Sequence, residues 1–258
     1  MRLAFLILFL AGSRLYASQL NGLDPKVIGV WHLNEDEGTF TEDATGNGAG
    51  GVLTSGPIWI TGKFGSGLSF PAPAALRRVV TDVAQEGKFD FTVNDDFYMV
   101  CFAKFRSDRT DKAIIGKAAT CSSQGWGICQ QTQGFVAIRV RENGTADCLV
   151  GWDGLGAIPA IYDDNKFHLV IGSWHNTGVC STSAKLWVDT SAATLDGSTG
   201  FPVTITNDVA VNIGGNSAGA AGVDVDECGI FRGLMTDDLQ ARLLRRFRQV
   251  TQVSDDDF

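Results

Sequence analysis

The chain has 258 residues, of which 44% are hydrophobic and 19% are charged, and its formal net charge is −8. This composition suits a globular protein with a substantial core, and the length suits one large all-β domain or two small ones. The negative charge argues against nucleic acid and anionic membrane surfaces as partners, because both are negatively charged and would repel an acidic protein.

Residues 1–17 have the pattern of a secretory signal peptide. Met1 and Arg2 make a short positive start, residues 3–11 form an apolar run, and Ala17 is a small residue at the expected cleavage position. Arg14 is unusual in such a segment, so an uncleaved anchor or a buried N-terminal strand remains an alternative. Removing the segment takes away Arg2 and Arg14 and no acid, which changes the charge from −8 to −10. No later apolar run is long enough to span a bilayer.

Short strand patterns, separated by glycine and Asn/Asp turns, fill most of the remaining chain. The nearly continuous apolar run Phe97–Phe105 predicts a strand that is covered on both faces, and Asn143-Gly144 predicts a hairpin turn. Strands are expected at 27–33, 67–70, 78–83, 97–105, 113–117, 126–132, 135–140, 146–152, 167–174, 184–188, 202–206, 209–213 and 226–231. Many short strands without helical periodicity between them indicate a sandwich or a barrel.

One helix is expected near the C-terminus. Thr236 can cap it, and Asp237 and Asp238 would stabilise its positive end. An apolar stripe of Leu239, Leu243, Leu244 and Phe247 would dock it on the sheets. Residues 251–258 form an acidic tail. The sequence predicts a single domain at 18–250.

Several segments occur in the order of motifs in laminin-G-like, concanavalin A-like domains. The sequence resembles that family in Val30-Trp31-His32-Leu33-Asn34-Glu35, Asp43-Ala44-Thr45-Gly46-Asn47-Gly48, Gly62-Lys63-Phe64-Gly65, Lys166-Phe167-His168, Leu186-Trp187-Val188-Asp189 and Asp224-Val225-Asp226-Glu227-Cys228. It departs from the family at Phe102, where a tryptophan is usual, and at Thr190, where a glycine is usual. The resemblance implies an all-β fold: an antiparallel β-sandwich of the jelly-roll, concanavalin A-like kind, with one short C-terminal helix.

The six cysteines favour an oxidising, extracellular location. The sequence contains no C-x-x-C pair, which argues against a zinc site. Six cysteines can instead form three disulfides, in 15 possible connectivities. In a cytosolic protein the same residues would be small buried side chains. Cys121 and Cys129 flank a short loop that they could close, and the resemblance implies that Cys101 and Cys228 lie on neighbouring strands. The partners of Cys148 and Cys180 stay open.

The resemblance also implies a structural calcium ion. Calcium binds six to eight oxygen atoms from carboxylates, carbonyls and water. Asp43 and Asn47 lie in a glycine-rich turn, Asp226 begins the closing strand, and Glu35 is a secondary candidate. The alternative is that Asp43 forms an Asx-turn and Asp226 caps the strand, with no ion.

Catalysis is not expected. A retaining glycosidase needs two carboxyl groups facing each other across the sugar bond, and no strand carries such a pair in the family's order; Asp224, Asp226 and Glu227 belong to the closing strand. His32, His168 and His175 are expected to be structural, and no nucleophile motif is present.

Sugar binding is the remaining prediction. Aromatic rings stack on sugars, and neighbouring amides and carboxylates bind sugar hydroxyls. The candidate residues are Trp126, Trp152, Asp153, Tyr162, Trp174 and Asn176; core packing is the alternative for each ring. The sequence therefore predicts a secreted lectin-like or adhesion module that binds a glycan or glycoprotein. Its rival is a structural subunit of an extracellular appendage, matrix or virus particle that self-associates through the sandwich.

Overall fold

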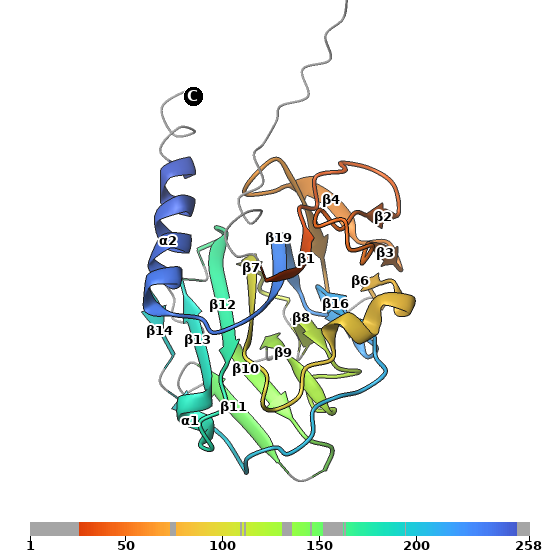
Figure 1. The fold of residues 1–258 in the computed structure, drawn as a ribbon. Helices are drawn as coiled ribbons and strands as arrows, with labels where there is room; N and C mark the ends of the chain where they lie inside the picture. Colours follow the sequence, from red (N-terminus) through yellow and green to blue (C-terminus); the bar gives the residue numbers. More distant parts are fainter. Residues whose placement is uncertain are drawn as a thin grey trace, which may run out of the picture.

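The chain forms an antiparallel β-sandwich, as predicted (Figure 1). The computed structural model describes residues 26–72, 76–108, 110, 112–130, 136–144, 146–151, 162, 164–193 and 195–251, and the side chains in these ranges except those of 195, 196 and 246–251. The predicted signal peptide at 1–17 and residues 252–258 of the predicted acidic tail lie outside the described residues.

Short strands account for most of the regular structure. The strands are β1 (Val27–Trp31), β2 (Phe40–Thr41), β3 (Gly51–Thr54), β4 (Ile58–Thr61), β5 (Ser66–Phe70), β6 (Arg78–Thr81), β7 (Phe97–Phe105), β8 (Lys112–Lys117), β9 (Gly125–Gln130), β10 (Val136–Arg141), β11 (Asp147–Gly151), β12 (His168–Trp174), β13 (Ala184–Val188), β14 (Ser191–Ala192), β15 (Leu195–Asp196), β16 (Asn212–Ile213), β17 (Gly215–Asn216), β18 (Gly219–Ala220) and β19 (Val223–Arg232). The helices are the 3-10 helix η1 (Val83–Phe89), α1 (Cys180–Ser183) and α2 (Asp237–Thr251).

Two large sheets make the sandwich. The eight-stranded sheet has the order β14-β13-β12-β7-β19-β5-β4, and β1 pairs with β19 beside this path. The nine-stranded sheet has the order β15-β11-β10-β9-β8-β16-β6-β3-β2. Segments from both ends of the chain therefore meet in the eight-stranded sheet, where β19 pairs with β1, β5 and β7.

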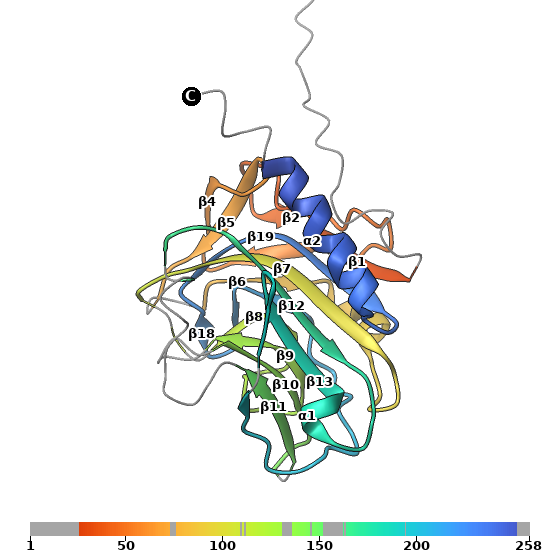
Figure 2. The ribbon, with the colours of Figure 1, turned by 90° about the vertical axis from the view of Figure 1, so that its left-hand side faces the viewer.

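Strand β7 is buried on both faces, which confirms the prediction from its apolar run. Met99 and Cys101 belong to the core between the sheets. Tyr98 and Val100 belong to a second cluster, which also contains Leu239 of α2. Figure 2 shows the resulting three layers, with α2 lying over the eight-stranded sheet. In the described part of the chain, the outer face of the nine-stranded sheet has no helix like α2 lying over it.

The C-terminal helix begins as expected. The backbone N–H of Leu239 donates to Oγ1 of Thr236 at 3.1 Å, and Leu239 and Leu243 are buried against the sheet. None of the helices in the described ranges combines the length and the apolar character that crossing a membrane would require.

Some elements differ from the prediction. Strands β2, β3 and β4 were not predicted because each is short. The turn between β3 and β4 has positive φ at Ser55 and Gly56. Residues 202–206 were expected as a strand but have no strand structure. Their alternating pattern reflects Ile205, which packs into the core from an irregular segment.

Three disulfides link the described cysteines. Cys101 pairs with Cys228, and Cys121 pairs with Cys129, as expected. The third disulfide joins Cys148 to Cys180. The first of these connects β7 to β19, the two strands at the centre of the eight-stranded sheet.

Candidate ligand-binding face

A single row of residues crosses the open outer face of the nine-stranded sheet. Register partners on adjacent strands lie on the same side of a sheet. The row consists of Phe40, Val52, Val80, Asn212, Gly116, Gly127, Arg139 and Leu149, each paired with the next. The alternate positions Leu53, Val79, Ile213, Ile128, Ile138 and Val150 pack into the core. We call this line of residues the outer row.

A groove of about 540 Å³ lies at the Phe40 end of the outer row. It is lined by Phe40, Gly48, Gly50, Val52, Thr54, Arg78, Val80, Thr81, Asp82 and Val83, and is called the Phe40 groove. The Phe40 side chain is 49% exposed, and Val52 and Val83 are also exposed. A Cβ atom at Gly50 would lie 2.3 Å from Cζ of Phe40, so the ring lies directly over this glycine.

Polar groups border this apolar surface. Nη1 of Arg78 donates to the carbonyl oxygens of Leu76 and Asn216, each at 3.2 Å. Burial lowers the pKa of Arg78 below its ordinary value, and its Nε atom has no hydrogen-bond partner in the described structure. Asp82 accepts from the backbone N–H of Ala84 at 2.9 Å. The groove thus combines an aromatic platform with a cation and a carboxylate, the mixture that small polar ligands require.

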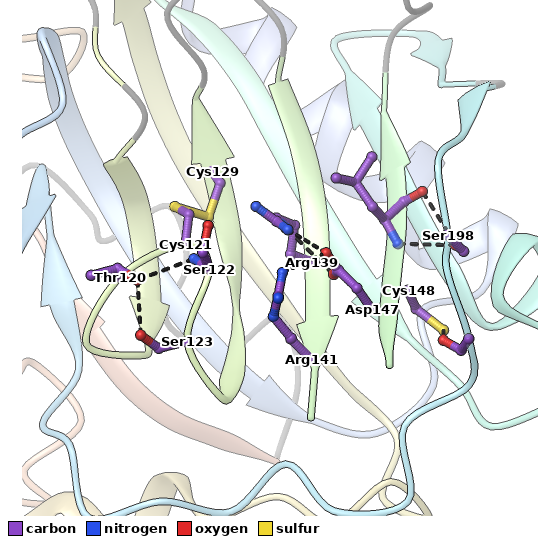
Figure 3. A network of polar contacts seen from close by, with 12 residues as sticks. Thr120, Cys121, Ser122, Ser123, Cys129, Arg139, Arg141, Asp147, Cys148 and Ser198 are labelled. Atoms are coloured by element: carbon purple, nitrogen blue, oxygen red, sulfur yellow. Dashed lines mark hydrogen bonds and ion pairs between the residues drawn. A yellow bond between two sulfur atoms is a disulfide. The ribbon is translucent and has the colours of Figure 1, made fainter. Parts of the chain in front are cut away.

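A second, smaller depression lies at the other end of the outer row and is called the arginine pocket. Arg139 and Arg141 project from β10 on the same side, and Asp147 of β11 lies beside both (Figure 3). Nη1 of Arg141 lies 3.0 Å from Oδ2 of Asp147. Nε of Arg139 lies 3.4 Å from Oδ1, and its Nη2 also contacts Oδ2.

The rings predicted to bind sugars are packed in the core instead. Trp126 is 2% exposed, and its ring centroid lies 5.3 Å from that of Phe91 and 5.4 Å from that of Phe97. Trp174 is 1% exposed, and its Nε1 donates to the carbonyl of Val93 at 2.9 Å. This corrects the prediction, because neither ring presents a face to solvent.

Tyr162 and Asn176 also lie away from the outer row. Tyr162 is buried, and its hydroxyl donates to the carbonyl of Val188 at 3.2 Å. Asn176 is exposed but donates to Oδ1 of Asn94 at 2.9 Å, and it does not line either depression. Trp152 and Asp153 lie outside the described residues.

Asp43 and Asn47 close the free edge of β1. The Asp43 carboxylate accepts from the backbone N–H groups of Val30, Thr45 and Ala49, at 3.1, 3.0 and 3.1 Å. Nδ2 of Asn47 donates to the carbonyl of Ile28 at 2.8 Å. The carboxylate is thus surrounded by N–H donors, which is the Asx-turn alternative rather than a cation site.

Asp226 is also held by the backbone. It is fully buried, and Oδ2 accepts from the N–H of Phe64 at 2.8 Å. Oδ1 is buried without a partner in the described part of the protein. Glu35 instead accepts from Thr41 and from the N–H of Glu42. Among the described residues no three His, Cys, Asp or Glu side chains gather where they could hold a metal, so the predicted set does not fit calcium.

The pKa of Asp226 predicts a pH effect on stability. Burial raises this pKa well above its ordinary value, so the folded protein holds the proton more tightly than the unfolded chain. The resulting stabilisation is complete below the ordinary pKa and is lost as pH rises through the raised pKa. The Asp226→Asn variant has no carboxyl group to deprotonate, so it does not lose this stability. Its amide oxygen can still accept from the N–H of Phe64. The free energy of unfolding of the variant, relative to wild type, should therefore rise from about pH 4 to about pH 7.

Urea denaturation at several pH values measures this difference. Two stability curves that stay parallel across the range would contradict a raised pKa at Asp226.

All three histidines contact carboxylates, which is in keeping with the structural role predicted for them. Burial opposes a charge on His168, but its hydrogen bonds to Asp189 at 2.8 Å and Asp164 at 3.0 Å outweigh it and raise its pKa. Nδ1 of His175 lies 2.6 Å from Asp96. Both ring nitrogens of His168 are occupied, so this residue has no free nitrogen for proton transfer to a ligand.

Fold and surface together define a β-sandwich with a groove of ligand size at one end of its nine-stranded sheet. No protein-family model matches the chain. No curated protein matches it either. The laminin-G-like assignment therefore stays a prediction.

Solved structures share the fold at low sequence identity. The binding domain of Paraclostridial Mosquitocidal Protein 1 is 13% identical with a TM-score of 0.62, over 88% of this chain and 53% of that one. The receptor binding domain of botulinum neurotoxin C/D mosaic serotype is 10% identical with a TM-score of 0.63, over 87% and 51%. Trypanosoma rangeli sialidase is 12% identical with a TM-score of 0.60, over 90% and 34%. The chain thus spans about half or less of each structure, and the likeness supports the β-sandwich alone.

Proposed function

We propose that this protein is a secreted carbohydrate-binding module that holds glycans on the outer face of its nine-stranded sheet. The observation that carries the proposal is the Phe40 groove, about 540 Å³ in volume, with a half-exposed aromatic ring on a flat strand surface. A sugar ring has an apolar face that stacks on an aromatic side chain, while its hydroxyls need polar partners at the edge of the platform. Phe40, with Arg78 and Asp82, supplies both.

The location and the lack of catalysis are parts of the same proposal. Disulfides persist in oxidising compartments outside the cytosol, and all six cysteines are paired in three disulfides. Asp82 is the one acidic side chain that lines the Phe40 groove in the described part of the chain. Hydrolysis by two carboxylates would need a second one across the sugar bond. The neighbouring structures include a binding domain and a receptor binding domain, which is in keeping with a binding role.

The test is a glycan-array screen followed by calorimetry on the hits. Phe40→Ala is expected to weaken glycan binding about tenfold or more, which is about 1.4 kcal/mol, because the stacking platform is lost. Since Phe40 is half exposed, the thermal unfolding temperature should change little.

A matched control is Ile58→Ala. Ile58 is 50% exposed and lies on β4, at the edge of the other sheet, so its removal should leave glycan affinity unchanged. Equal affinities for wild type and Phe40→Ala would contradict the proposed groove. If no glycan binds and the protein elutes as an oligomer that Phe40→Ala disrupts, the groove is instead an assembly surface of a structural subunit.

A further inference from the structure

The arginine pocket has a charge imbalance that a bound anion would correct. Arg139 is 8% exposed, and Asp147 is also buried. Both Arg139 and Arg141 pair with that one carboxylate, so among the described residues the cluster carries one positive charge in excess. The Arg141 side chain is 25% exposed, so a negatively charged group from solvent can pair with it.

One hydrogen-bond donor in the pocket remains unused. Nε of Arg141 is buried and has no partner among the described residues, although Nη1 of the same side chain reaches Asp147. A guanidinium group binds carboxylates through two parallel N–H donors, one of which is often Nε. The unpaired Nε–H of Arg141 therefore indicates where a bound anion would accept a hydrogen bond.

The floor of the pocket is bare backbone. Gly116 and Gly127 are register partners beside Arg139. A Cβ at Gly116 would lie 2.7 Å from the carbonyl oxygen of Trp126, and one at Gly127 would lie 2.9 Å from that of Ile115. A larger residue at either position would clash with the neighbouring backbone, so this floor favours glycine.

The wall opposite Arg139 and Arg141 is a loop that a disulfide closes. The hydroxyls of Thr120 and Ser123 lie 2.8 Å apart in the loop that Cys121–Cys129 closes (Figure 3). The depression is partly open to solvent, and its volume of about 10 Å³ admits about one oxygen atom, which a carboxylate can supply.

We propose that the arginine pocket binds the carboxylate of an acidic sugar, so that the outer row holds a uronic-acid glycan. The inference rests on the proposed glycan-binding function. Phe40 on β2 and Arg139 on β10 are separated by six strand spacings, roughly 29 Å, a length that a longer oligosaccharide spans. The Phe40 groove then stacks a sugar ring, and the pocket selects for the acid.

The test compares a galacturonate trisaccharide with its fully methyl-esterified form, which keeps the rings and removes the charges. Calorimetry on the full oxidised protein is expected to show about tenfold tighter binding of the acid, the effect of one charge-assisted contact. Arg141→Gln should abolish that preference and leave the affinity for the ester unchanged. Arg242→Gln removes the same charge from α2, where Arg242 pairs with Asp238, and should keep the preference.

A second measurement separates this inference from the proposed function. The Nε–H NMR signals of Arg139 and Arg141 should shift saturably with galacturonate monomer and not with its methyl ester, whether or not the Phe40 groove binds sugar. No shift with galacturonate, or an equal affinity for acid and ester, would overturn the pocket. An equal response to inorganic sulfate would overturn the assignment to carboxylated sugars. Binding of neutral glycans that depends on Phe40 would leave the proposed function standing in each case.

Discussion

Replacing Cys101 and Cys228 together by alanine is expected to lower the free energy of unfolding by about 5 kcal/mol. This disulfide closes a loop with a sequence separation of 127 residues, and the loss of loop-closure entropy in the unfolded chain grows with the logarithm of that length. Both cysteines are fully buried between β7 and β19. Their removal therefore also leaves a small cavity in the core, which adds to the cost.

The other two disulfides provide a graded comparison. Their sequence separations are 32 residues for Cys148–Cys180 and 8 residues for Cys121–Cys129, which correspond to about 3.7 and about 2.5 kcal/mol. Chemical denaturation of the three double-alanine variants should rank them in that order. A reducing agent that breaks all three disulfides should make the wild-type protein less stable than any of the three variants. A larger loss from the Cys121–Cys129 variant than from the Cys101–Cys228 variant would contradict the loop-length argument.

Replacing Trp126 by alanine is expected to lower the free energy of unfolding by about 3–5 kcal/mol. Its ring packs between the sheets against Phe91 and Phe97, which themselves stack at a centroid distance of 4.3 Å. Truncation would leave a cavity that rigid strands on both sides cannot close. The loss should appear as a lower denaturation midpoint, while the fraction that remains folded binds glycan with wild-type affinity.

Trp126→Phe is the matched control because it keeps an aromatic ring in the same space and should lose much less stability. The contrast with Phe40→Ala is the informative result, since one variant should lose stability and the other should lose binding. A Trp126→Ala protein with normal stability and weakened glycan binding would place the sugar on Trp126 and contradict the core position.

The fold could be predicted because its strongest signals are patterns of burial. A run such as Phe97–Phe105 must be covered on both sides, and the structure covers it with the second sheet and with α2. The helix was predictable for a similar reason, since its leucine stripe and its Thr236 cap are local features. The strands at 40–41, 51–54 and 58–61 were missed because each has only two to four residues, too few to show an alternating pattern.

The ligand-binding face was harder to predict, because a sequence lists aromatic residues without saying which side of a strand each occupies. In β9 the signal was present: Trp126 and Ile128 alternate with Gly125 and Gly127, so the large residues share one face and the glycines share the other. Reading that alternation would have placed Trp126 in the core. Phe40 lies in a two-residue strand with no pattern around it, and only the register with Val52 and Val80 brings it onto the outer row.

The central position of β19 in its sheet determines when the sheet can form during synthesis. A ribosome delivers the chain from its N-terminus, yet β1, β5 and β7 all pair with a strand that spans Val223–Arg232. Until that segment emerges, the three earlier strands have no common neighbour and Cys101 has no thiol partner. Such distant pairings delay folding. The eight-stranded sheet is therefore complete only after Val223–Arg232 has been synthesised, and a nascent chain stalled before Val223 would expose the edges of β1, β5 and β7 to chaperones and proteases.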